Sequence, residues 1–598
     1  MNKFIYSISI SVAIVADGSI QASQETIGPM GINSAVTGLT GAGIPIGQVE
    51  GSRAGKFGYD NAAGCCNSQV VPDGVFVQDM GAAPNQSIDD HALWVASVMI
   101  SKQTAVDPNT GVSPPLGVAQ QANLLSSAII DTFSGGLEED AAITAQVIAG
   151  SVWAINMSFG VPLEGGFQMD GNSLLSQFVD WSTRQHEVLY VKAGNEGGDD
   201  RRIPSDSFNG ITVAASRRED DGVFRGVAGL NDYSDEVDAA GVRTSTHILA
   251  PGVLIDVAGA NGTQPPRGES TGTSFAAPHV TGTLAILHQQ ANTTNGHRHQ
   301  TMKAVLLNSA DKIKGIIGME RTVVKQDESD WFSTEAHTDE AIPLDRQMGV
   351  GHLNAKRAVE QLAGGEHGPG GVPLKGWDFF FQDDPFIPNK YTITLSEGDF
   401  VSATLVWDRE LFLNSGELEY QRGDDFADLG FENLDLHLVP AGMGIDQAVE
   451  SSTSTAWNLE HIFASVPMDG PYEIWVTLSA GDFIHVDYAL AWWAGTDARP
   501  EPGDFNSDGS VDAADYVVWR KNDGSLAGYN EWRANFGSSS GSGGLASVPE
   551  PSGLVLMAFA VVVVGLRQAT FADPRSAARL LTCGHGYPQH NGNQRHSN

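Results

Sequence analysis

The sequence predicts an α/β domain, then an all-β domain, then a small helical calcium-binding module. Up to Leu362 the chain mixes helix-like and strand-like apolar patterns, and the run Val280–Leu287 has helical spacing. Beyond a glycine-rich stretch, segments such as FVSATLVWD and YEIWVTL alternate apolar and polar residues, which predicts strands with one buried face. The acidic loop DFNSDGSVDAAD, Asp504–Asp515, has the spacing of a calcium loop and precedes a short helical run.

Composition favours an exported protein and excludes nucleic-acid binding. The 598 residues are enough for several domains, and a hydrophobic content of 41% is enough for buried cores. A formal net charge of −38 repels the phosphates of a nucleic acid. Two of the three cysteines, Cys65 and Cys66, are adjacent, and the third is Cys583, so no disulfide framework is expected.

Residues 1–23 predict a cleaved secretion signal. One lysine precedes an apolar core, Phe4–Ala16, and small residues follow near Ala22. The apolar core is too short for a membrane span. We therefore expect a protein that is secreted or held at the cell surface.

The octapeptide GTSFAAPH, Gly272–His279, points to a nucleophilic serine. Ser274 stands between small residues at the start of an apolar helical run, which leaves room for a substrate to approach its hydroxyl. A Gly-Thr-Ser turn before a helix is also a common helix cap, so the tripeptide alone does not identify a catalytic serine. The whole octapeptide is much rarer than such a cap.

This octapeptide resembles the nucleophile segment of the subtilase family of serine peptidases. Two upstream segments resemble that family in the expected order: INMSFG, Ile155–Gly160, is similar to a strand of the substrate cleft, and VKAGNEGG, Val191–Gly198, to the oxyanion-hole segment. The resemblance implies a parallel sheet with flanking helices over residues 34–362. It also implies hydrolysis of a protein or peptide substrate through an acyl-enzyme on Ser274, with Asn195 as the amide donor to the oxyanion.

His91 is the expected general base. The family's histidine opens a motif reading HGTHVAG, and this chain reads HALWVAS, His91–Ser97, in the corresponding place. The histidine matches, whereas the next three residues depart from the family pattern. Its position at the start of a helical apolar run suits a base that faces outward from a helix. His279 is the rival histidine, and we interpret it as structural.

Glu50 stands where the family has its aspartate. It follows the apolar run of the strand IPIGQVEGSR, Ile44–Arg53, and keeps the order acid, base, nucleophile. A glutamate carboxylate can hold the imidazole tautomer and stabilise the imidazolium, and hydrolases of another fold use glutamate in this role. Its extra methylene displaces the carboxylate unless the backbone retreats, and such a displacement lowers the rate by about 100-fold. Asp89 and Asp90, next to the histidine, are interpreted as helix-cap residues.

Residues 374–497 are predicted to form a β-sandwich behind a glycine-rich linker, Leu362–Pro373. The alternating segments resemble the sandwich that many subtilases carry behind the catalytic domain. The simplest interpretation is a stabilising or substrate-docking module without chemistry of its own.

Residues 504–537 are predicted to bind calcium. Oxygen-bearing residues recur at the ligand positions of a calcium loop, and Gly509 permits the sharp turn at its sixth position. The loop ends in aspartate, and a second helical segment, Tyr529–Phe536, lacks a ligand loop of its own. The module therefore resembles a dockerin, which implies a cohesin-like partner. The expected ligands are Asp504, Asn506, Asp508, Ser510, Asp512 and Asp515.

Residues 548–567 resemble a PEP-CTERM sorting signal. The segment VPEPS, Val548–Ser552, precedes the apolar run Gly553–Leu566 and Arg567. This run is shorter than the roughly 20 residues that cross a bilayer, which favours a processed anchor, and a permanent C-terminal anchor is the alternative. Both imply a membrane or cell-surface tether. The polar tail, residues 568–598, has no assigned role.

Two classes of function fit these features. The first is a secreted, calcium-binding, subtilisin-like serine endopeptidase that uses Glu50 as its acid. The second is a catalytically impaired subtilase scaffold that acts in adhesion or assembly at the cell surface. The position of the acid distinguishes them, because a carboxylate oxygen within about 3 Å of a His91 ring nitrogen supports the enzyme and a gap supports the scaffold.

Overall fold

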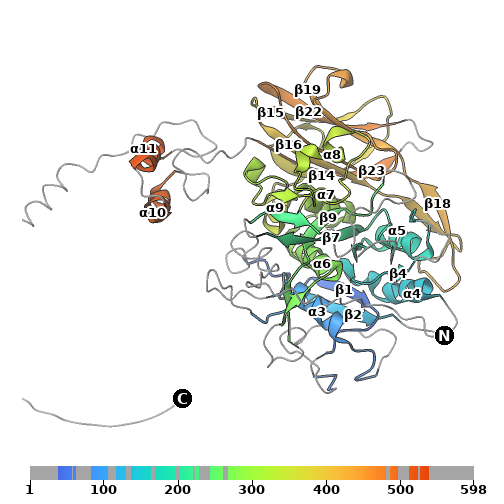
Figure 1. Cartoon of the computed structure of the whole chain (residues 1–598). Helices are drawn as coiled ribbons and strands as arrows, with labels where there is room; N and C mark the ends of the chain where they lie inside the picture. The colour runs from blue at the N-terminus through green and yellow to red at the C-terminus, as the bar shows by residue number, and fades with distance from the viewer. Residues whose placement is uncertain are drawn as a thin grey trace, which may run out of the picture. The chain divides into compact units, whose positions relative to one another are not determined.

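In the computed structural model of this chain, the described residues fall into two compact units, unit 1 up to Arg499 and unit 2 from Pro500 (Figure 1). The expected secretion signal, sorting segment, polar tail and all three cysteines lie outside the described residues. The described ranges are 38–56, 58–61, 83–104, 116–129, 136–162, 169–195, 202–219, 222–227, 243–259, 267–479, 485–495, 511–522 and 526–537.

A mainly parallel sheet of eight strands forms the centre of the first half of unit 1 (Figure 1). The strand order is β12-β8-β7-β5-β3-β1-β2, and β9 also pairs with β7. The strands β2, β1, β3, β5, β7 and β9 are parallel, whereas β8 is antiparallel to β7. The bounds are β1 Pro45–Glu50, β2 Asn123–Ala128, β3 Ala154–Met157, β5 Leu189–Ala193, β7 Ile211–Arg218, β8 Phe224–Gly226, β9 Ile248–Pro251 and β12 Val323–Val324.

Helices cover both faces of this sheet because successive residues of the buried strands point to opposite sides. On β5, Leu189 and Val191 pack in one core with Val280 of α6, whereas Tyr190 packs in another with Phe178 of α5. The predicted α/β fold with a parallel sheet and flanking helices is confirmed. The helices are α3 Asp90–Ile100, α4 Leu137–Ala149, α5 Leu174–His186, α6 Thr273–Gln290, α7 His299–Asn308, α8 Glu335–Thr338 and α9 Ala355–Leu362.

Shorter elements connect these layers. Strand β4 pairs with β6, and β10 with β11, each in an antiparallel pair. Their bounds are β4 Val161–Pro162, β6 Arg202–Ile203, β10 Ile255–Val257 and β11 Arg267–Ser270, and the short 3₁₀ helices are η3 Asn295–His297, η4 Ile316–Gly318, η5 Trp331–Ser333 and η6 Ile445–Gln447.

The second half of unit 1 is the predicted β-sandwich, made of a five-stranded and a four-stranded sheet. Alternate residues of the two inner faces form one apolar core, which includes Leu405, Leu436 and Trp492. One sheet has β13 Gly370–Gly371, β15 Asn389–Leu395, β22 Gly470–Leu478, β19 Leu434–Pro440 and β20 Glu450–Ser452. The other has β14 Lys375–Gln382, β23 Val486–Gly495, β16 Phe400–Trp407 and β21 Leu459–Ser465, and β17 Glu410–Leu413 pairs with β18 Phe426–Gly430 in a separate hairpin.

The sandwich is joined to the α/β part by a shared core. Val406 of β16 and Ala491 of β23 belong to the same buried cluster as Leu306 of α7. The β17–β18 hairpin extends beside α5, where Leu411 packs with Phe178 (Figure 1). The glycine-rich stretch after α9 therefore connects two parts that pack on each other.

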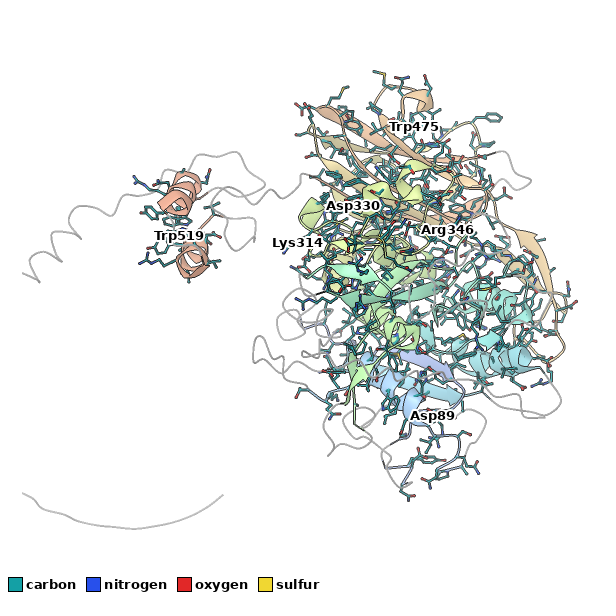
Figure 2. The ribbon with its side chains drawn as sticks, viewed as in Figure 1. Asp89, Lys314, Asp330, Arg346, Trp475 and Trp519 are labelled. Carbon is teal, nitrogen blue, oxygen red and sulfur yellow. The ribbon has the colours of Figure 1, made fainter. Side chains whose placement is uncertain are left out.

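The described part of unit 2 is a pair of helices, α10 Ala513–Asn522 and α11 Leu526–Asn535. Aromatic rings hold the pair together, with Trp519 5.5 Å from Tyr529 between ring centroids (Figure 2). In the part of the chain that the structure describes, every helix is too short or too polar to cross a bilayer.

Candidate active site

Three predicted site residues lie at the ends of their elements. Glu50 is the last residue of β1, and His91 and Ser274 are the second residues of α3 and α6. The carboxyl ends of parallel strands meet at one edge of a sheet, where helices begin and ligands bind in folds of this class. Glu50 and His91 are buried, whereas Ser274 is partly exposed.

The cap of α3 fixes where His91 stands. Asp89, labelled in Figure 2, is the N-cap, and its carboxylate accepts a hydrogen bond of 3.0 Å from the Ala92 N–H. The side chain of Gln48, two residues before Glu50 on β1, donates to the Ala92 carbonyl at 2.8 Å. The start of α3 is thus tied to the same strand that carries the acid.

Glu50 and His91 form an ion pair that is longer than a hydrogen bond. The distance between Glu50 Oε2 and His91 Nδ1 is 3.6 Å, which exceeds the length of a hydrogen bond. The other carboxylate oxygen, Oε1, is buried without a hydrogen-bond partner among the described residues. Burial raises the pKa of the Glu50 carboxyl, and the contact with His91 opposes this rise. The acid is therefore beside the base, at a distance longer than a hydrogen bond.

The imidazole of His91 also lies beside the nucleophile helix. Its ring contacts the ring of Phe275 edge-on, with 5.8 Å between centroids. Phe275 directly follows Ser274, so the structure brings the acid, the base and the nucleophile segment to one place.

Ser158, after β3, is paired with Ser274 through both hydroxyls. Ser158 Oγ donates to the Ser274 carbonyl at 2.9 Å, and Ser274 Oγ donates to the Ser158 carbonyl at 3.2 Å. The first bond has a clear cause, because Pro278 has no N–H to donate to the carbonyl four residues earlier in α6. The second directs the only proton of the Ser274 hydroxyl to Ser158 in this conformation.

Asn195 follows β5 and is buried with a fixed orientation. Its Oδ1 accepts a hydrogen bond of 2.9 Å from the Arg202 N–H. Its Nδ2 is 3.4 Å from the sulfur of Met169, a weak acceptor. The amide group therefore keeps Nδ2 as the donor, as an oxyanion site requires. Thr273 Oγ1 joins this segment to α6 by a bond of 2.8 Å to the Gly194 carbonyl.

His279 is buried inside α6, and its Nδ1 is 2.8 Å from the Phe275 carbonyl. Burial lowers the pKa of its imidazole to about 4, so the ring is neutral near pH 7. This placement suits a core histidine.

The expected calcium ligands are only partly within the described residues. Asp504, Asn506, Asp508 and Ser510 lie outside them. Asp512 and Asp515 form a capping box at the start of α10, since Asp512 Oδ1 accepts from the Ala514 N–H and Asp515 Oδ2 from the Asp512 N–H, each at 2.7 Å. Within the ranges given above, His, Cys, Asp and Glu side chains form no group of three that could hold a metal ion.

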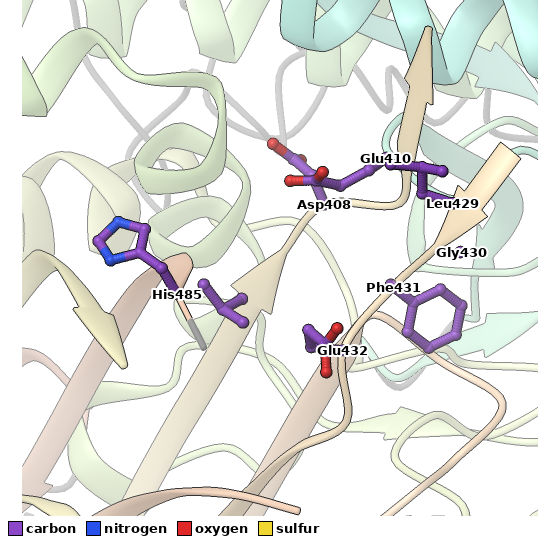
Figure 3. A pocket seen from close by; sticks show the side chains of 8 residues that line it. Asp408, Glu410, Leu429, Gly430, Phe431, Glu432 and His485 are labelled. Atoms are coloured by element: carbon purple, nitrogen blue, oxygen red, sulfur yellow. The ribbon is translucent and has the colours of Figure 1, made fainter. Parts of the chain in front are cut away.

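A small pocket of about 40 Å³ lies apart from these residues, where the sandwich meets the β17–β18 hairpin (Figure 3). The carboxylate of Asp408 on its wall already binds His299 Nε2 at 3.0 Å and Gln300 Nε2 at 2.7 Å. The pocket is lined by Asp408, Glu410, Leu429, Gly430, Phe431, Glu432, His485 and Val486.

The sequence did not reveal the residues that orient the site. Met169 and Arg202, on either side of the Asn195 amide, stand in no motif, and only their three-dimensional position identifies them. Ser158 is within the predicted cleft strand segment, but its bond to the nucleophile depends on the proline four residues after Ser274.

Comparison with known proteins supports the subtilase family. Residues 66–351 match the model described as the subtilase family, a range that includes His91, Asn195 and Ser274 and begins after Glu50. Subtilisin NAT of Bacillus subtilis subsp. natto is 26% identical over 327 residues, which are 52% of this chain and 75% of the relative. Thermitase of Thermoactinomyces vulgaris is 28% identical over 209 residues, 35% of this chain and 63% of the relative.

Solved structures also match the chain. The crystal structure of MycP1 with its N-terminal propeptide removed is 17% identical and covers 55% of this chain and 94% of its own, with a TM-score of 0.35.

Proposed function

We propose that this protein is a subtilisin-like serine endopeptidase that hydrolyses peptide bonds through an acyl-enzyme on Ser274. The observation that carries the proposal is the meeting of Glu50, His91 and the Ser274–Phe275 segment at the end of β1 and the start of α6. Subtilisin NAT and thermitase, the relatives named above, support a protein or peptide substrate.

In the proposed mechanism, His91 accepts the proton of the Ser274 hydroxyl as the serine attacks the scissile carbonyl, and then gives it to the leaving amine. Glu50 stabilises the imidazolium that forms. Asn195 Nδ2 and the backbone N–H of Ser274, at the start of α6, donate to the oxyanion. The attack requires the Ser274 hydroxyl to turn from the Ser158 carbonyl toward His91, and Glu50 to shorten its 3.6 Å contact.

The test is hydrolysis of a fluorogenic peptide and of casein by the purified full chain. We expect activity in the parent protein and its loss in Ser274→Ala. The matched control is Ser333→Ala, because Ser333 is an exposed serine on η5 outside the site. Equal activity of the parent and of Ser274→Ala would refute the proposal.

A second candidate function, an impaired subtilase scaffold in adhesion or assembly, is favoured by the same contacts. The 3.6 Å distance between Glu50 and His91 is longer than a hydrogen bond, and the Ser274 hydroxyl donates to the Ser158 carbonyl in this conformation. This candidate predicts a folded parent protein that hydrolyses neither substrate at any pH between 5 and 10, a range that we choose to cover the histidine titration.

We further propose that the chain is exported, binds calcium at residues 504–515 and is tethered through residues 548–567. The calcium loop supplies only oxygen donors, which suits this ion, and the exposed Asp512 stands at its described end. A cohesin-like protein is the proposed partner of the dockerin-like module. Calcium would be held by the loop next to α10 and takes no part in the peptidase reaction.

A further inference from the structure

Arg409 is a residue of the sandwich that is buried in the α/β part. It lies between β16 and β17 and is 3% exposed. Its guanidinium donates to the Gly171 carbonyl at 2.7 Å and contacts the Asp180 carboxylate at 3.3 Å. A further bond reaches the Asn172 side chain. One side chain thus binds three groups of the neighbouring part of the fold.

Gly171 and Asn172 belong to the segment that begins with Met169. This segment contacts Nδ2, the donor atom of the Asn195 amide. Met169, whose sulfur is 3.4 Å from Asn195 Nδ2, stands two residues before Gly171. The guanidinium therefore holds the backbone of the chain that carries Met169. A shift of this backbone would change the direction in which Nδ2 points.

A second segment, residues 202–209, contacts Oδ1, the acceptor atom of the Asn195 amide. Its last residue, Asn209, is hydrogen-bonded to the backbone of Arg409. The Arg409 N–H donates to Asn209 Oδ1 at 2.8 Å, and Asn209 Nδ2 donates to the Arg409 carbonyl at 2.9 Å. Asn209 lies in the connection that follows β6, and Arg202 of β6 donates its N–H to Asn195 Oδ1. This connection is also bound to the first segment, because the Asp206 carboxylate accepts from the Gly171 N–H at 2.8 Å.

The Asp180 carboxylate contacts both Asn209 and the Arg409 guanidinium, whose positive charge stabilises it. Asp180 is fully buried, and it accepts a bond of 2.8 Å from the Asn209 N–H. Burial raises the pKa of Asp180, and the charge of Arg409, followed by the Asn209 N–H and the charges of Lys192 and Arg243, opposes that rise. A buried carboxylate that loses its ion-pair partner moves or becomes protonated, so loss of the arginine disturbs the Asn209 segment through Asp180 and the Gly171 segment through the lost guanidinium bonds.

We propose that Arg409 is a positioning residue for the Asn195 amide, so that the β-sandwich contributes to transition-state stabilisation in the catalytic part. The inference rests on the proposed peptidase function and adds a role for the sandwich beyond stability or docking. It assigns no contact between Arg409 and the substrate.

Three variants of the full chain test the proposal. Arg409→Met removes the charge and all guanidinium bonds. Arg409→Lys keeps a cation beside Asp180 but lacks the planar fork that reaches several partners at once, so it remains informative if the first variant fails to fold. The control is Arg422→Met, because Arg422 also belongs to the β17–β18 hairpin region and pairs with Glu139 and Asp140 of α4.

We expect Arg409→Lys and Arg409→Met to lower kcat by about tenfold or more with KM changed less than about twofold, because an oxyanion donor acts mainly on the transition state. In an Asn195→Ala background the same changes should lower kcat no further, since the effect passes through that amide. Arg422→Met should keep both constants. Equal losses in the two backgrounds, or a change in KM alone, would overturn the proposal.

A readout without turnover separates this inference from the peptidase proposal. In Ser274→Ala protein labelled with ¹⁵N-asparagine, the side-chain amide signal of Asn195 is assigned by its loss in Asn195→Ala. We expect that signal to shift in Arg409→Lys and to stay in Arg422→Met. An unchanged signal in Arg409→Lys refutes the positioning role, whereas an inactive parent with a shifted signal refutes only the peptidase.

Discussion

Replacing His299 with glutamine removes a positive charge that binds one carboxylate of the sandwich and one of the α/β part. His299 begins α7 and is 3% exposed. Its Nδ1 is 2.7 Å from Glu187, after α5, and its Nε2 is 3.0 Å from Asp408, after β16. Burial by itself lowers the pKa of His299, but the two carboxylates outweigh it and raise the pKa to about 9. The imidazole is therefore a cation at neutral pH, bound on both sides.

The rise from the ordinary value of 6.5 to about 9 corresponds to about 3 kcal/mol of folding free energy. Because the pKa of His299 is raised in the folded state, this contribution is complete below pH 6.5 and is lost as the pH rises through 9. The difference in unfolding free energy between the parent and His299→Gln should thus fall by about 3 kcal/mol from pH 6 to pH 10.

Urea unfolding at the two pH values, followed by tryptophan fluorescence, measures this difference. Titrating groups that lie away from His299 and its two carboxylates are common to both proteins and cancel. His485→Gln is the control, since the His485 side chain is 60% exposed and its replacement should change the unfolding free energy by less than about 1 kcal/mol. A difference between the parent and His299→Gln that stays constant from pH 6 to pH 10 would refute a charged, doubly bound imidazole.

The other predictions concern the site and the calcium loop. Glu50→Gln should lower kcat/KM by about 10² to 10⁴-fold, because an amide cannot stabilise the imidazolium, and steady-state kinetics on a fluorogenic peptide will show a smaller effect if the acid is idle. Asn195→Ala should lower kcat by about 10²-fold with little change in KM, and a rise in KM alone would mean that the amide binds the ground state. Calcium added to chelator-treated protein should change the emission of Trp532, whose indole donates to the Asp512 carbonyl at 2.7 Å, and Asp508→Ala should abolish the change in a fluorescence titration.

The sequence was sufficient to predict the elements that carry the site, because each is marked by adjacent residues. Small residues around Ser274 and the polar start of α3 are local signals, and Glu50 ends an apolar strand. A parallel sheet then brings the carboxyl ends of its strands to one edge, so these positions follow from the order of segments.

The details that decide activity could not be predicted in this way. Whether Glu50 is 3 Å or 3.6 Å from His91 depends on small backbone shifts that no pattern of residues encodes. The pair of Arg409 and Asp180 joins residues 229 positions apart, and neither stands in a motif. The glycines after α9 suggested a linker, yet Trp377 Nε1 donates to the Leu362 carbonyl at 2.9 Å and anchors the sandwich directly.

The most direct measurement is covalent labelling of the full chain with a fluorophosphonate, followed by peptide mapping in a mass spectrometer. A hydroxyl reacts with this probe only when a base activates it. The account predicts one modified peptide, with the adduct on Ser274, and no adduct in Ser274→Ala. An unmodified protein, or an adduct on another serine that persists in Ser274→Ala, would contradict it.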